Sequence, residues 1–357
     1  MKRDIPWGWL VLSFLLLCPA FAQDKQNTMS SKEARPAPPL QLEDVPQTPS
    51  LQEERDTSIS VEMKIAMEEA LKRKEYEKVE LQLVKLIEQN PQAAPLLTFL
   101  GRVFFLDAKP LNSAVAFKKA ERLAPLKESD QYLLALCWVA MQKSQYAAEE
   151  FQKLQQAYPQ NPLYLYWLGR IDYDNYRYEA AVTRFQKALE LDPQYVKVYD
   201  NLGLCYEMMS DFARAEPNYV KGVQLNRSQK NPSAWPPLNY ATFLVRTNRP
   251  QEAEPFLKEA LGYSSRFALA HYQLGLALEK QKKYPEGLES LKKAAEYDPA
   301  SPDPHYALIR IYRQLGEKEK AEAEMKIFQE LKQAQKMKEH PTAKSDITAQ
   351  EPAGITK

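Results

Sequence analysis

The sequence predicts an all-α fold, a solenoid of about eight stacked helix pairs between residues 60 and 335. Two observations lead to this prediction. Prolines recur every 34 residues at Pro91, Pro125, Pro159 and Pro193. The composition also suits helices, because only 10 of the 357 residues are glycine and 44% are hydrophobic. A repeat of this length is typical of a small helical unit that stacks on copies of itself.

The first 22 residues are typical of a secretory signal peptide. Lys2 and Arg3 precede an apolar stretch from Trp7 to Cys18, and Ala20 and Ala22 form a small-x-small site, so we expect cleavage after Ala22. The apolar stretch is shorter than the roughly 20 residues that a membrane-spanning helix needs. We therefore expect an exported protein, periplasmic or extracellular, without an integral membrane span after cleavage. The minority alternatives are anchoring by an uncleaved signal and anchoring by a lipid on the cysteine.

Two further segments lack the periodicity of the solenoid. Residues 23–59 form a leader rich in Pro and Gln, and residues 336–357 form a polar tail of the same character. Neither segment has enough apolar residues to offset the entropy lost on ordering. We expect both segments to be disordered.

Within the solenoid, four other places repeat in step with the prolines. A Leu-Gly pair such as Leu168 and Gly169 comes first, then a small residue such as Ala181, an aromatic such as Phe185 and a second small residue such as Ala188. Small residues let two helices approach closely, larger ones fill the space between neighbouring pairs, and proline ends the second helix. The predicted units are 60–93, 94–127, 128–161, 162–195, 196–229, 234–267, 268–301 and 302–335.

This order of Leu-Gly, Ala, Phe, Ala and Pro resembles the tetratricopeptide repeat family. The resemblance covers about three quarters of the chain. It is weaker in the first unit, at Ala66 and Met67, and in the last, at Ile309, as expected for units that cap a stack. It implies a right-handed solenoid whose first helices line a concave groove that binds segments of partner proteins. Pro217 and Pro255 depart from good helix chemistry, and we expect each to delay or bend its helix.

When this arrangement is applied to the sequence, the first half of the groove becomes apolar and aromatic. Packing between helices is the competing interpretation, because aromatic residues at helical spacing often form cores. Trp167, beside the Leu-Gly packing pair, is the residue that we least expect to be wholly buried. The residues expected to line this half are Phe99, Phe105, Tyr132, Leu133, Leu136, Val139, Tyr166, Trp167 and Tyr173.

Farther along, Asn201 and Asn239 take the same inward place in successive units, and Gln273 takes it in the next. This row resembles the amides by which some family members hold a peptide backbone, because an amide offers both a donor and an acceptor. The family's carboxylate clamp needs Lys and Arg where Leu269 and Gln273 stand, so we do not predict binding of chaperone C-termini. The charged residues that map inward are Arg102, Arg170, Arg246, Arg310, Arg313, Glu207 and Glu279.

Motifs for catalysis or metal binding are missing from the sequence, including phosphate-binding glycine loops and zinc-ligand spacing. His271 and His305 lie one repeat apart, and helices packed about 8 to 10 Å apart would hold them too far from each other to share an ion. Cys137 and Cys205 lie two repeats apart, too far for a disulfide. We predict no enzyme activity, cofactor or metal. Because 48 basic residues balance 47 acidic ones, we also predict no nucleic-acid partner.

The predicted function is a scaffold or adaptor that binds a segment of a partner protein in its groove during assembly of an envelope or secreted complex. Two alternatives remain open. One is a structural solenoid that self-associates through its aromatic half. The other is a binder of glycans or small ligands that uses Tyr166, Trp167 and Tyr173 as stacking platforms.

Overall fold

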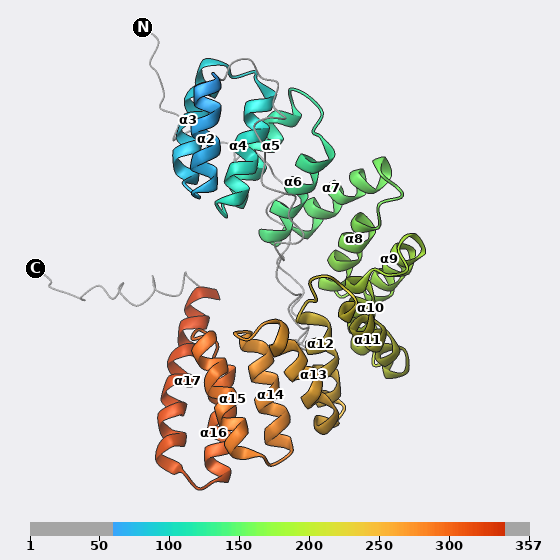
Figure 1. Cartoon of the computed structure of the whole chain (residues 1–357), viewed down its shortest axis with the longest axis vertical. Coiled ribbons are helices and arrows are strands. Elements are labelled where there is room, and N and C mark those ends of the chain that lie inside the picture. Colours follow the sequence, from blue (N-terminus) through green and yellow to red (C-terminus); the bar gives the residue numbers. More distant parts are fainter. Residues whose placement is uncertain (1–59, 340–357) are drawn as a thin grey trace, which may run out of the picture. The chain divides into compact units, whose positions relative to one another are not determined.

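The computed structural model describes residues 60–339, which belong to one compact unit (Figure 1). The predicted signal peptide, the leader and the tail beyond residue 339 lie outside the described residues. The described chain folds into sixteen α-helices joined by short turns. They are α2 (Val61–Lys72), α3 (Tyr76–Gln89), α4 (Ala94–Leu106), α5 (Pro110–Glu121), α6 (Glu128–Ala140), α7 (Ser144–Ala157), α8 (Pro162–Asp174), α9 (Tyr178–Leu191), α10 (Val196–Met208), α11 (Phe212–Arg227), α12 (Trp235–Arg246), α13 (Pro250–Tyr263), α14 (Ala268–Lys280), α15 (Tyr284–Tyr297), α16 (Asp303–Gln314) and α17 (Lys318–Glu339).

The helices pack in eight consecutive pairs, which confirms the predicted fold class. In each pair the even-numbered first helix packs against the odd-numbered second helix, and each second helix also contacts the first helix of the next pair. First helices of neighbouring pairs touch each other, as α10 touches α12 and α12 touches α14, whereas second helices show no comparable contacts within residues 60–339. First helices therefore lie closer together than second helices, and they form the inner face of the curved stack.

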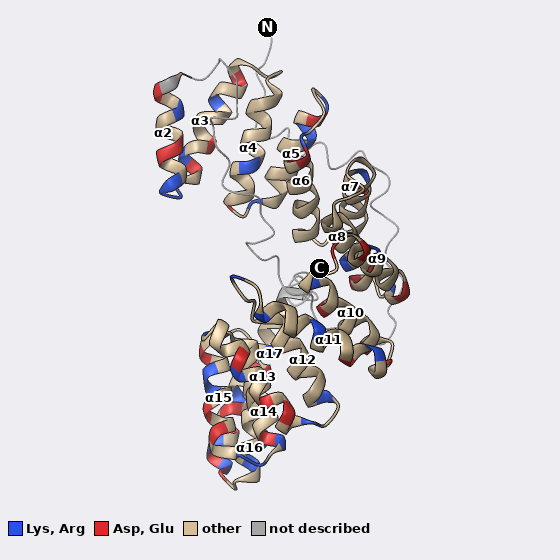
Figure 2. Cartoon of the chain, turned by 45° about the vertical axis from the view of Figure 1, so that its right-hand side comes forward, with Lys and Arg blue, Asp and Glu red and all other residues tan. Residues whose placement is uncertain are grey.

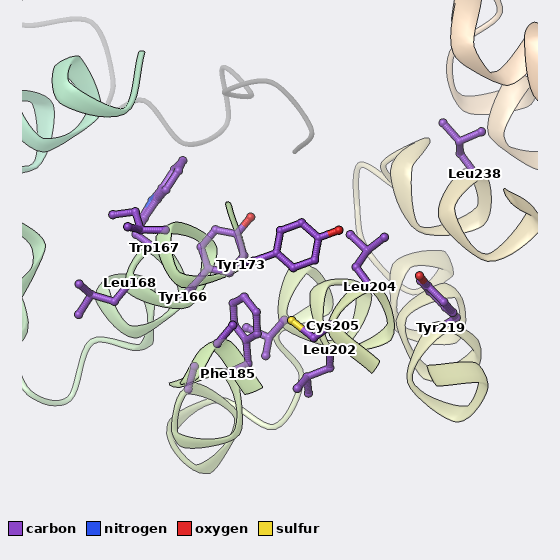
Figure 3. Close-up of a cluster of buried hydrophobic side chains, with 14 of the residues drawn as sticks. Tyr166, Trp167, Leu168, Tyr173, Phe185, Leu202, Leu204, Cys205, Tyr219 and Leu238 are labelled. Carbon is purple, nitrogen blue, oxygen red and sulfur yellow. The ribbon is translucent and has the colours of Figure 1, made fainter. Parts of the chain in front are cut away.

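The close approach within a pair depends on the repeated glycine. A Cβ atom added to Gly169 would lie 2.6 Å from Cε1 of Phe185, well inside van der Waals contact. Gly203 has the same relation to Tyr219, also at 2.6 Å. Phe185 is fully buried between α8 and α9 (Figure 3). The structure thus confirms that glycine acts as a spacer and the aromatic residue as a filler.

The turn inside each pair has a feature that the sequence does not reveal. One residue of every turn has a positive φ, and in the first seven pairs this residue is not glycine. Only the last pair places a glycine there, Gly316 with φ of 76°. The seven others are Lys74, Ala108, Gln142, Tyr176, Ser210, Asn248 and Lys282.

Two expectations about helix limits need correction. Helices α11 and α13 begin upstream of Pro217 and Pro255, so neither proline delays the start of its helix. Each proline is the sixth residue of its helix and has no N–H group, so each helix lacks one backbone hydrogen bond there. A local bend at these prolines stays a prediction. Helix α17 continues to Glu339, beyond the predicted end at residue 335, because Lys336–Glu339 are good helix formers.

The core of the stack consists of three clusters of buried apolar side chains. The largest cluster of buried apolar side chains extends from α5 to α14, and smaller clusters occupy the first two pairs and the last two. Among residues 60–339, we find no helix with the length and apolar character required to cross a membrane.

Candidate functional site

The aromatic residues of α6 and α8 pack against one another on the inner side of the stack. The Trp167 ring stacks on Phe151 of the preceding pair, with 5.6 Å between ring centres and 5° between planes. Its Nε1 donates a hydrogen bond of 2.9 Å to the Tyr132 hydroxyl. Only 7% of Trp167 is exposed, less than we expected from the sequence. The reason is that the indole fits between two pairs, where its ring face and its donor both find partners.

Tyr166 and Tyr173 are also buried. The Tyr166 ring lies 6.1 Å from Phe185 of its own pair and 5.4 Å from Tyr195, which precedes the next pair. The Tyr173 ring lies 5.5 Å from the Tyr178 ring, and the Arg170 guanidinium lies 5.5 Å from its centre. In Figure 3, Trp167 stands on the side of α8 away from Phe185. The face of the Trp167 ring that would meet a sugar is in part taken up by Phe151.

The predicted row of amides joins neighbouring pairs. Asn201 accepts a hydrogen bond from Arg170 and donates one of 2.7 Å to the Lys197 carbonyl. Asn239 donates one of 2.7 Å to Asp200 of the preceding pair. Both asparagines are buried, and so is Phe99, which belongs to the core of the first two pairs. The structure therefore uses these amides in contacts between helices.

Ion pairs between first helices continue this pattern along the inner face. Arg102 pairs with Asp130, its Nη2 lying 2.9 Å from Oδ2, and both side chains are buried. Arg246 lies 3.1 Å from Glu207, and Arg310 Nε donates a hydrogen bond of 2.9 Å to Glu279. In both of these ion pairs the carboxylate is less exposed than the arginine: Glu207 is buried and Glu279 is partly buried, while Arg246 and Arg310 reach the surface.

The inner side becomes accessible over α14 and α16. Leu269 is 39% exposed and Tyr306 is 48% exposed, although both are large apolar residues on first helices. Gln273 is half-buried, Lys280 is exposed, and the Arg310 side chain is 41% exposed. These five residues are called the C-terminal inner face below. The Arg310 guanidinium lies 5.5 Å from the Tyr306 ring centre, so the charged and aromatic groups are adjacent.

Sequence reasoning identified Gln273 and Arg310 on this face but missed Tyr306 as a site residue. A signal for it exists in the repeat register, since Tyr132, Tyr166 and Tyr306 occupy the same place in their units.

Figure 2 shows how charged residues are distributed along the stack: blue and red segments are dense over α15 and α16, whereas α6 and α12 are largely tan.

Both histidines within residues 60–339 have local partners, and both cysteines there are buried. His271 Nε2 lies 3.0 Å from the Ser265 carbonyl, and His305 Nδ1 lies 2.6 Å from Glu324. Cys137 and Cys205 are buried free thiols, and burial raises the pKa of each to about 12. In the part of the chain that the structure describes, no three side chains of the His, Cys, Asp and Glu types form a group suited to a metal ion.

Family models match four stretches of the chain. A TPR repeat model matches residues 169–210. Tetratricopeptide repeat models match residues 131–161, 241–302 and 278–327. All four stretches lie within the stacked helix pairs.

Two curated proteins are similar to parts of the chain. The type IV pilus assembly protein PilF of Pseudomonas aeruginosa is 30% identical over 132 residues, which are 36% of this chain and 52% of PilF. A DnaJ homolog subfamily C member 7 homolog of Schizosaccharomyces pombe is 26% identical over 187 residues, 49% of this chain and 39% of that protein. The chain thus spans about half the length of these relatives or less.

Solved structures share the fold at low identity. The APC/C hetero-tetramer Cut9-Hcn1 superposes with a TM-score of 0.56 at 16% identity, covering 69% of this chain and 48% of that one. The type IV pilus biogenesis factor PilW superposes with a TM-score of 0.50 at 17% identity, covering 61% of this chain and 95% of PilW. Both comparisons support the stacked helix pairs.

Proposed function

We propose that this chain, a tetratricopeptide repeat protein, is a non-enzymatic scaffold that binds a segment of a partner protein on its inner face. The observation that carries the proposal is the exposure of Leu269 and Tyr306 on the inner side of the stack. Exposed apolar side chains beside anchored polar groups are typical of a protein interface. Gln273, Glu279 and Arg310 supply those polar groups around them.

We further propose that the protein is exported and acts in the assembly of an envelope complex. Two features support this proposal: the signal-like first 22 residues and the similarity to PilF, which is named as a pilus assembly protein. The expected partner is therefore another component of such a complex, held through one of its extended or helical segments.

The test is affinity capture from an envelope extract by the mature chain from Gln23 and by a variant with Leu269→Ala and Tyr306→Ala. Leu81→Ala is the matched control, because Leu81 is 65% exposed but lies on the second helix α3. We expect a protein captured by the parent and the control, with at least about tenfold less retained by the double variant. Circular dichroism must show equal helix content in all three.

Equal capture by all three proteins would contradict binding at the C-terminal inner face. Sedimentation of the parent addresses the self-association alternative, because a self-associating solenoid changes mass on dilution. A stable dimer that the double variant dissociates would replace the scaffold proposal with self-association.

A further inference from the structure

We infer that the segment bound by the C-terminal inner face is acidic and carries at least one large apolar residue. The inference rests on the proposed function and narrows it to a class of partner. Three features support it: the charges of the ion pairs that reach the surface, one lysine without a carboxylate partner among residues 60–339, and the apolar groups beside them.

The ion pairs of this region present their positive members outward. The Arg246 side chain is 46% exposed and its partner Glu207 is 6% exposed. The Arg310 side chain is 41% exposed and its partner Glu279 is 18% exposed. An approaching segment therefore meets guanidinium groups first, while the carboxylates below hold them in place. A guanidinium has five donor hydrogens, so each arginine can bind a second acceptor while it keeps its first.

Lys280 adds a positive charge that no carboxylate of the described residues offsets. Its Nζ donates a hydrogen bond of 3.0 Å to the Val245 carbonyl, which is adjacent in sequence to Arg246. Lys280 also directly follows Glu279, the partner of Arg310. Lys280 and Arg310 belong to the face, and Arg246 lies beside it on α12. These three cations face two partner carboxylates, so the balance is positive. A negatively charged segment is favoured there and a positively charged one is repelled.

The apolar part of the site lies beside these charges. Leu269 begins a stripe on α14 that ends at Lys280, and Tyr306 lies next to Arg310 on α16. A segment crossing both helices would meet apolar contacts and cations within a few residues of each other. Large apolar residues flanked by Asp or Glu would complement this order of groups.

The experiment is selection of short random peptides displayed on phage, with the full mature chain as bait. The key variant is Lys280→Glu, which changes a charge without disturbing a buried carboxylate. Lys292→Glu is the matched control, because Lys292 is exposed in the same pair but lies on the second helix α15. We expect selected peptides to be rich in Asp and Glu around Leu, Phe or Tyr. Their affinity should fall about tenfold with Lys280→Glu, stay unchanged with Lys292→Glu, and decrease with added salt.

The possible failures are distinguishable. If the selected peptides lose binding with Tyr306→Ala but are neutral or basic, the acidic class is wrong and the proposed function stands. If equal losses follow Lys280→Glu and Lys292→Glu, the positive face does not select the ligand, and the inference is overturned. If no selected peptide depends on Tyr306, or if none is selected at all, the inner face is not a peptide site and both proposals fail.

Discussion

Tyr166 and Tyr306 occupy the same place in the repeat, yet their surroundings differ. Tyr166 is 5% exposed, because Trp167, Phe185 and Tyr195 surround its ring. Tyr306 belongs to the last pair and is 48% exposed, with Phe328 as its one aromatic neighbour among the described residues. The repeat register thus assigns a residue to the inner side, but the neighbouring pairs decide whether it is core or surface. The third and fourth pairs use their inner aromatics for stability, whereas the eighth pair leaves Tyr306 available.

The largest expected difference between these regions is in stability. Trp167→Ala should lower the free energy of unfolding by about 3–5 kcal/mol, because it removes a buried ring stacked on Phe151 and a hydrogen bond to Tyr132. Tyr306→Ala should change it by less than about 1 kcal/mol, since nearly half of the side chain is already exposed. Urea unfolding followed by far-ultraviolet circular dichroism measures both. Similar losses for the two variants would show that the inner aromatics of both regions serve the same structural role.

The spacer glycines give a finer comparison. Gly169→Ala should cost about 1–3 kcal/mol, because the new Cβ would press on the rigid Phe185 ring at 2.6 Å. Gly275→Ala in the seventh pair should cost less, since its neighbour at 2.5 Å is Leu291, whose side chain can change rotamer. Gly262 in α13 has no atom within 4 Å of an added Cβ, so Gly262→Ala should stabilise the protein by up to about 1 kcal/mol.

Thermal and urea unfolding of the three glycine variants would rank them. If Gly275→Ala is the most damaging of the three, the Phe185 ring in the fourth pair does not resist the added Cβ more than the Leu291 side chain in the seventh pair does. A loss of stability in the Gly262→Ala control would mean that helix propensity does not govern the open positions of the second helices.

The sequence predicted the fold well, because packing of helix pairs imposes small residues, aromatics and prolines at fixed intervals. It also placed Arg170 and Arg310 on the inner side. Their different exposures depend on residues about 30 positions away, such as Asn201 for Arg170 and Glu279 for Arg310. No local pattern records those partners. The burial of Trp167 likewise requires Phe151 from another pair, which a single unit of the repeat does not show.

The turns show a second limit of sequence reasoning. Glycine normally reveals a positive φ, because other residues are strained there. Only Gly316 gives this signal, while Tyr176 adopts a φ of 61° without it. Short connections between tightly packed helices impose this backbone geometry on whatever residue stands in the turn.

The contacts between neighbouring pairs also differ in chemistry, so lowering the pH should affect their stability to different extents. In the sixth and seventh pairs, Glu254 accepts hydrogen bonds from Lys258, at 2.7 Å, and from Lys283, at 2.9 Å. These hydrogen bonds lower the pKa of Glu254 to about 2, and the bond from Lys258 has the largest effect. The joint between the third and fourth pairs combines rings such as Phe151 and Trp167, which do not titrate, with a hydrogen bond from Tyr164 to Glu128, and among the described residues no ion pair with a lysine joins these two pairs.

Because the folded pKa of Glu254 lies below its ordinary value of 4.5, its stabilisation is fully present above about pH 4.5 and is lost as the pH falls toward 2. Glu254→Gln should therefore lower the free energy of unfolding by up to about 1 kcal/mol near pH 6, and the gap between parent and variant should shrink near pH 3. Urea unfolding at both pH values measures the gap, and the parent's general response to acid cancels in the difference. Hydrogen exchange of α13 and α15 locates the effect, which should spare α7 and α8. If the difference in free energy of unfolding is equal at both pH values, the charge of Glu254 does not contribute to stability. The contrast between an ionic and an aromatic joint would then have no support.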